Sequence, residues 1–111
     1  MRKKILIADN SEDSLKYYRC ALPAHICITT TDGNEAVERF IKEKPDMVFL
    51  NGAVMNKNGF EIAKEIRTLD AFIKIIMISS NSEVKDRALV AGCDEFYLKP
   101  ISPKQLRELT V

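Results

Sequence analysis

Five side chains with polar or charged groups end or follow the short apolar segments of this sequence. They are one carboxylate, two amides, one hydroxyl and one ammonium group: Asp9, Asn10, Asn51, Ser79 and Lys99. A carboxylate can ligate a hard cation, form an ion pair or act as a nucleophile. An amide has no anionic oxygen and offers only neutral donors and acceptors. Because Asp9 is the only anion of the set, we expect it to pair with Lys99 rather than to take part in catalysis.

Apolar segments that alternate with helical patterns must position these side chains. The segments that we expect to be strands are residues 5–8, 26–30, 47–50, 73–78 and 96–98. Their continuous apolar character predicts a sheet that is covered on both faces. Right-handed crossovers make such a sheet parallel, with helices on both sides. Ligands of these sheets bind beyond the carboxyl ends of the strands, and the five polar side chains lie at those ends.

Signals for helix ends delimit the helices between the strands. Pro23 is expected to end the first helix, and Asn34 is expected to cap the second. Gly92 is well placed to end the helix that precedes the last strand. Ser102, followed by proline, predicts a capped start for a final helix, which is short because the sequence stops at Val111 after about two turns.

The composition is that of one globular domain over residues 1–111, with 46% hydrophobic and 30% charged residues. The net charge of +1, from 17 basic and 16 acidic residues, argues against a nucleic-acid partner. Three cysteines without a C-x-x-C pair argue against a disulfide framework and a zinc site. The apolar segment near the N-terminus is too short for an export signal or a membrane span, so we expect a cytoplasmic protein without a membrane partner.

Sequence segments in the right order resemble the receiver domain of bacterial response regulators. They are KKILIADN, PDMVFLNG, KNGFEIAKEIR, IIMISS and AGCDEFYLKPIS, and together they cover nearly the whole chain. The resemblance implies a flavodoxin-like, doubly wound α/β fold with a five-stranded parallel sheet of order 2-1-3-4-5. It also implies a signalling protein of the two-component or phosphorelay type.

The resemblance assigns family roles to residues of this chain. It places Asn51 at the phosphoacceptor position, Asp9 and Asn10 at the acidic pair that binds Mg²⁺, Ser79 at the hydroxyl position, Phe96 at the switch aromatic and Lys99 at the lysine. The resemblance further implies a cis peptide bond between Lys99 and Pro100, which proline makes accessible.

Two substitutions separate the sequence from a working receiver. Asn51 has no anionic oxygen, so it cannot attack a phosphohistidine to form an acyl phosphate. Asn10 removes a second carboxylate and leaves Asp9 alone, and we therefore expect weak or absent Mg²⁺ binding and no cofactor. These changes predict a pseudo-receiver that is not an enzyme and acts as a phosphorylation-independent protein–protein interaction module.

An alternative function stays open, in which the chain is a phosphorelay receiver with a non-standard acceptor, either Asp9 or a deamidated Asn51. An enzyme of the same fold is disfavoured, because no Gly-rich phosphate loop or nucleophile elbow is present. The expected partners are proteins, such as a histidine kinase or an effector domain. By the resemblance, the exposed candidates for a partner surface are Lys85, Arg87, Tyr97, Lys104 and Arg107.

Overall fold

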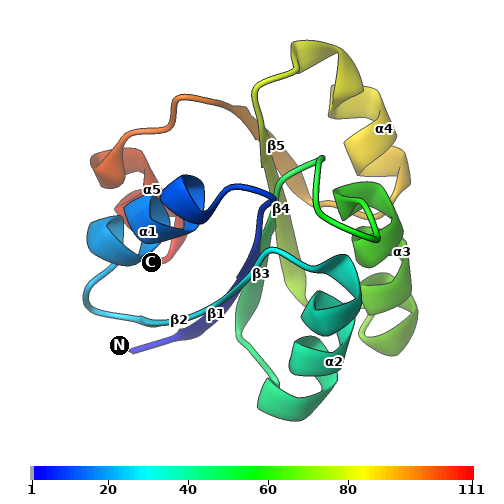
Figure 1. Ribbon diagram of the computed structural model, residues 1–111, viewed down its shortest axis with the longest axis horizontal. Helices are drawn as coiled ribbons and strands as arrows, with labels where there is room; N and C mark the ends of the chain where they lie inside the picture. Colours follow the sequence, from blue (N-terminus) through cyan, green and yellow to red (C-terminus); the bar gives the residue numbers. More distant parts are fainter. Residues whose placement is uncertain (1) are drawn as a thin grey trace.

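The computed structural model describes residues 2–111, which form a single sheet flanked by helices (Figure 1). The elements follow one another as β1 (Lys4–Ala8), α1 (Glu12–Ala21), β2 (Ile26–Thr30), α2 (Gly33–Glu43), β3 (Met47–Leu50), α3 (Gly59–Leu69), β4 (Lys74–Ser79), a 3₁₀ turn (Ser82–Val84), α4 (Lys85–Val90), β5 (Glu95–Leu98) and α5 (Pro103–Leu109). This alternation of strands and helices is the order that the sequence predicts.

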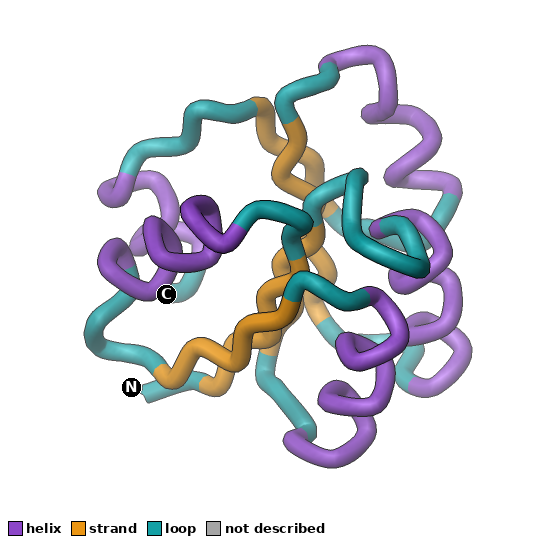
Figure 2. The backbone as a smooth tube through the Cα atoms, viewed as in Figure 1, coloured by secondary structure: helices purple, strands orange, loops and turns teal. Residues whose placement is uncertain are grey.

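All strand pairs are parallel, and the sheet has the order β2-β1-β3-β4-β5. Helices α1 and α5 cover one face, and α2, α3 and α4 cover the other (Figure 2). Two apolar cores fill the space between helices and sheet, one on each face. Every residue of the central strand β3 is buried, which explains its unbroken apolar sequence. The predicted flavodoxin-like, doubly wound fold is confirmed.

Short polar side chains fix the helix starts. Ser11 caps α1, Asn58 caps α3 and Ser102 caps α5, in each case by accepting a backbone N–H three residues later. The cap of α2 differs from the prediction: it is Asp32, whose Oδ1 accepts the N–H of Asn34 at 2.8 Å. The capping residue lies two positions earlier than expected, because the helix already begins at Gly33.

Two further sequence signals act as expected. Gly92 follows α4 with φ of +109°, a left-handed conformation that favours glycine. The peptide bond between Lys99 and Pro100 is cis. Helix α5 has seven residues and carries the buried Leu106 into the core next to α1. None of the helices over residues 2–111 combines the length and apolar character that a membrane span requires.

Candidate functional site

The carboxyl ends of four neighbouring strands bring the predicted side chains to one edge of the sheet. Ala8 pairs with Leu50, so Asp9 and Asn51 follow at the ends of adjacent strands. Ser79 ends β4 and pairs with Leu98, so Lys99 follows directly beside it. The backbone N–H of Lys99 donates to the Ser79 carbonyl at 2.8 Å. The polar cluster is therefore a consequence of parallel register.

A buried ion pair lies at the centre of the cluster. Lys99 Nζ donates to Asp9 Oδ2 at 2.8 Å, and the carboxylate is only 1% exposed. The second oxygen, Oδ1, accepts the backbone N–H of Ser11 at 3.0 Å. Both oxygens of the carboxylate are thus satisfied by donors from the protein, which offsets the cost of burying a charge.

Asn51, which directly follows β3, is held by its amide nitrogen. Nδ2 donates to the Ala53 carbonyl at 2.9 Å and to Asn10 Oδ1 at 3.2 Å. The Ala53 carbonyl also accepts the backbone N–H of Asn10 at 3.2 Å. The amide therefore links the loop after β1 to the loop after β3, where a carboxylate could only accept hydrogen bonds.

The Asn10 amide has two orientations with different partners. In one, its oxygen accepts from Asn51 Nδ2 at 3.2 Å. Rotation by 180° brings its nitrogen to 3.1 Å from Asp9 Oδ1 and 3.2 Å from the Ala53 carbonyl, where it donates to both. The rotated amide satisfies two oxygens but gives up its bond with Asn51, whose nitrogen it then faces. In either orientation, N–H groups of neutral amides donate the hydrogen bonds within the cluster.

Ser79 is the last residue of β4, and Phe96 lies in the neighbouring strand β5. Ser79 is buried, and its Oγ accepts the backbone N–H of Asn81 at 3.1 Å, so the hydroxyl caps the turn before α4. Phe96 is half-buried and packs against the core on the α2–α4 face of the sheet. In this conformation the Ser79 hydroxyl caps the turn, and the Phe96 ring contributes to core packing.

The cluster fits a divalent cation poorly. Hard oxygen ligands could come from Asp9, from the Asn10 amide oxygen and from the Ala53 carbonyl. However, Asp9 is engaged by Lys99, and the carbonyl already accepts two N–H donors. Over residues 2–111 no group of three His, Cys, Asp or Glu side chains could hold a metal ion. We therefore derive no chemistry from a metal at this edge.

A hollow of about 290 Å³ adjoins Asn51 and Ser79 on the side of α4. The Arg87 guanidinium lies 4.0 Å above the centre of the Phe60 ring in this hollow, a cation–π contact. Arg87 is exposed, as predicted for a candidate of the partner surface, but its contact with Phe60 was not predicted. The contact joins α3 to α4, and no local pattern in the sequence indicates it.

The remaining partner-surface candidates lie on α4, β5 and α5. Lys85, Lys104 and Arg107 are exposed, as expected. Tyr97 is not: it is half-buried against the core on the α1–α5 face, and its hydroxyl donates to Glu95 at 2.6 Å. The prediction of an exposed Tyr97 is wrong, because one side of the residue packs against this apolar core and leaves it only partly exposed.

Comparison with known proteins defines the class of this fold and site. A family model described as the response regulator receiver domain matches residues 5–110. The chemotaxis protein CheY of Thermotoga maritima is 31% identical over 113 residues, covering 97% of this chain and 94% of that protein. The chain belongs to the response regulator receiver family, and it is a receiver domain of two-component signalling.

Other relatives differ in length. The alkaline phosphatase synthesis transcriptional regulatory protein PhoP of Bacillus subtilis is 32% identical over 110 residues, which cover 96% of this chain. The chain spans only 46% of the length of that regulator. Among solved structures, chemotaxis protein CheY4 of Vibrio cholerae superposes with a TM-score of 0.90 at 23% identity, over 99% of this chain and 97% of that one. The structural likeness supports the fold.

Proposed function

We propose that this receiver acts without phosphorylation, as a protein–protein interaction module in two-component signalling, and that it is not an enzyme. The observation that carries the proposal is the Asn51 amide directly after β3, whose nitrogen donates to the Ala53 carbonyl at 2.9 Å. An amide cannot form an acyl phosphate. Its nitrogen also donates to the Ala53 carbonyl, an oxygen that could otherwise ligate a cation at this edge.

The charge balance of the cluster supports a fixed state. Asp9 is the only carboxylate, and Lys99 neutralises it at 2.8 Å. Clustered carboxylates would repel one another without a metal ion, whereas here amides supply hydrogen bonds between the loops. The cluster is thereby stable without a cation, and we expect Mg²⁺ binding to be weak or absent.

The face formed by α4, β5 and α5 is the proposed partner surface. It presents the charged side chains Lys85, Lys104 and Arg107 next to exposed apolar ones. Val90 is 83% exposed and Leu98 is 50% exposed. Apolar side chains bordered by charges are typical of protein interfaces. A histidine kinase or an effector domain is the class of partner that we propose for this face.

The test is an NMR titration with Mg²⁺ and beryllium fluoride, which binds an aspartate carboxylate and imitates its phosphorylated form. We expect the amide signals of Ser79, Phe96 and Lys99 to stay in place in the wild-type protein. The doubly substituted Asn10→Asp, Asn51→Asp protein serves as the control, and its signals should move. A wild-type spectrum that shifts at these three residues contradicts the proposal.

The alternative function, a phosphorelay receiver with another acceptor, has two forms. Asp9 is disfavoured as the acceptor because it is 1% exposed and both its oxygens are engaged. Deamidation would make Asn51 an aspartate or isoaspartate: the Gly52 nitrogen attacks Cγ, ammonia leaves, and water opens the cyclic imide. The hydrogen bond from the Asn51 amide nitrogen to the Ala53 carbonyl holds the side chain against this ring closure. Peptide mapping after long incubation detects the product if it forms.

A further inference from the structure

An aromatic ring that is almost fully exposed to solvent lies at the opposite end of the sheet from the polar cluster. Phe72, in the connection between α3 and β4, is 96% exposed. A large aromatic side chain loses a favourable burial of roughly 150–250 Å² when it stands in water. Aromatic side chains are also the commonest anchors of protein interfaces. A ring exposed to this extent is therefore a candidate anchor for a binding partner.

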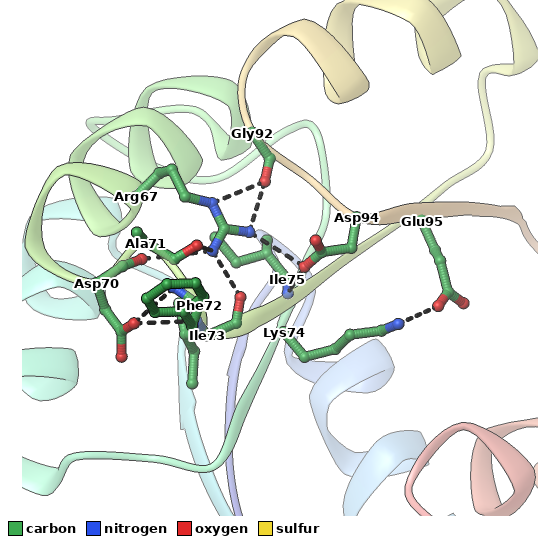
Figure 3. Close-up of polar contacts among 10 residues, drawn as sticks. All are labelled: Arg67, Asp70, Ala71, Phe72, Ile73, Lys74, Ile75, Gly92, Asp94 and Glu95. Carbon is green, nitrogen blue, oxygen red and sulfur yellow. Dashed lines mark hydrogen bonds and ion pairs between the residues drawn. The ribbon is translucent and has the colours of Figure 1, made fainter.

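The loop that carries Phe72 is held rigidly by polar contacts (Figure 3). Asp70 Oδ1 accepts the backbone N–H groups of Phe72 and Ile73 at 2.8 and 3.1 Å. Arg67 Nη1 donates to the carbonyls of Ala71 and Ile73 at 3.1 and 2.7 Å. The backbone that carries the ring is thus already ordered, so binding a partner loses little further conformational entropy.

Arg67 also fixes this loop to the next crossover of the fold. Its Nη2 donates to the Gly92 carbonyl at 2.7 Å and to Asp94 at 3.1 Å, and its Nε donates to the same carbonyl (Figure 3). Asp94 in turn accepts the backbone N–H of Ile75 at 2.8 Å. The guanidinium group joins the ends of α3 and α4 to the start of β4. The backbone of the Phe72 loop could therefore rearrange to cover the ring only by breaking these hydrogen bonds.

A hollow of about 380 Å³ lies next to this loop, between the C-terminal ends of α2 and α3. Its lining is mostly apolar: Phe40, Ile41, Pro45 and Leu69, with Lys44 and Asp70 also lining it. Ile41 is 57% exposed and Leu69 is 53% exposed, so the lining is open to solvent. The same end of the molecule therefore carries a projecting ring and an open apolar recess.

We propose that this end binds a second copy of the chain, with Phe72 of each copy inserted into the recess between α2 and α3 of the other. A two-fold interface requires one patch that is complementary to itself. The patch meets this requirement in shape, through the ring and the recess. It also meets it in charge, because Lys44 and Asp70 have opposite signs and both line the recess, so each copy offers both charges to the other.

The interface leaves the polar cluster and the face of α4, β5 and α5 free. It depends on one aromatic anchor from each copy, and protein–protein contacts of small area are weak and transient. We therefore expect a reversible dimer with a Kd of roughly 10 µM to 1 mM. The inference rests on Phe72, the loop and the recess, and it is independent of the state of Asn51.

Sedimentation equilibrium over a range of protein concentrations tests the proposal. We expect the wild-type protein to dimerise and Phe72→Ala to weaken the dimer by at least about 30-fold, as loss of an aromatic anchor does. Met55→Ala is the matched control, since Met55 is 55% exposed in the loop after β3, at the other end of the sheet, and it should leave the Kd unchanged. Lys44→Glu should weaken the dimer by removing the charge complementarity.

A second measurement locates the contact. In concentration-dependent NMR spectra, the signals of Ile41, Leu69 and Phe72 should shift together as the dimer forms. A wild-type protein that stays monomeric up to about 1 mM overturns the proposal. So does a dimer that Phe72→Ala leaves intact, or one that Met55→Ala weakens instead. Because Phe72 is 96% exposed, its truncation leaves the core packing unchanged, and circular dichroism verifies the fold of each variant.

Discussion

The ion pair between Lys99 and Asp9 offers a quantitative test of the site. Lys99→Met keeps the length of the side chain but removes the ammonium group that lies 2.8 Å from a carboxylate of 1% exposure. Breaking a buried pair by removing one partner costs about 3–5 kcal/mol. We expect a loss of about 3 kcal/mol, the lower end, because Lys99 is partly solvated and Asp9 keeps the N–H of Ser11.

Urea denaturation followed by circular dichroism measures this loss. With a slope of roughly 1–3 kcal/mol per molar urea for a small protein, the midpoint should fall by about 1–3 M. Adding Asp9→Asn to Lys99→Met removes the orphaned charge and should restore at least about 1 kcal/mol. Lys64→Met is the matched control, on the exposed face of α3, and should stay within about 0.5 kcal/mol of the wild type.

Two results would refute the reasoning. The first is a loss below about 1 kcal/mol for Lys99→Met, the value expected of a surface pair. The second is a double variant with Asp9→Asn that is no more stable than Lys99→Met alone. Either result would show that the Asp9 carboxylate does not depend on the ammonium group.

Three further predictions concern packing, thiol reactivity and pH. Gly59→Ala should destabilise the fold by about 1–3 kcal/mol in urea denaturation, because a Cβ there would collide with the Asn51 carbonyl. Burial raises the pKa of the Cys93 thiol to about 12, so iodoacetamide at pH 8 should label the exposed Cys20 first, as peptide mapping would reveal. The hydrogen bond from the Asn34 N–H lowers the pKa of the Asp32 carboxyl, so its contribution to stability is complete above the ordinary value of 3.8 and is lost as pH falls through the folded value.

Each of these predictions has a control. Gly52→Ala places its Cβ in ordinary van der Waals contact, 3.5 Å from Phe60, and should be tolerated; equal losses for Gly52→Ala and Gly59→Ala would contradict the packing argument. Labelling of Cys93 at the rate of Cys20 in the folded protein would contradict its burial. Asp32→Asn keeps a capping oxygen without titrating, and a difference from the wild type that does not vary with pH would contradict the linkage.

The sequence predicts most of the fold because its signals are local and agree with one another. Continuous apolar segments such as residues 47–50 indicate strands covered on both faces, and the structure buries all four residues. The predicted cap of α2, Asn34, lies two residues after the observed cap, Asp32. Asp32 and Asn34 are both good capping residues, and the choice depends on Gly33, which lies tightly against the Lys57 backbone, a contact between separate loops.

The positions of the site residues and the pairing of Asp9 with Lys99 could be predicted, but the other contacts of the site could not. The polar residues after each strand were expected at one edge because parallel register brings them there. The bond from Asn51 to the Ala53 carbonyl depends on the path of the loop after β3, which includes Asn56 at a φ of +68°. The contacts of Arg67 with Gly92 and Asp94 join residues 25 and 27 positions apart, and no periodic pattern specifies such a pair.

The most direct test of the central claim is the intact mass of the protein after incubation with Mg²⁺ and acetyl phosphate. Wild-type protein and the Asn51→Asp variant are measured side by side. We predict no added phosphoryl group on the wild type, because the Asn51 amide has no nucleophilic oxygen. A gain in the variant alone would identify Asn51 as the residue that prevents phosphorylation. A phosphoryl group on the wild-type chain would contradict the account.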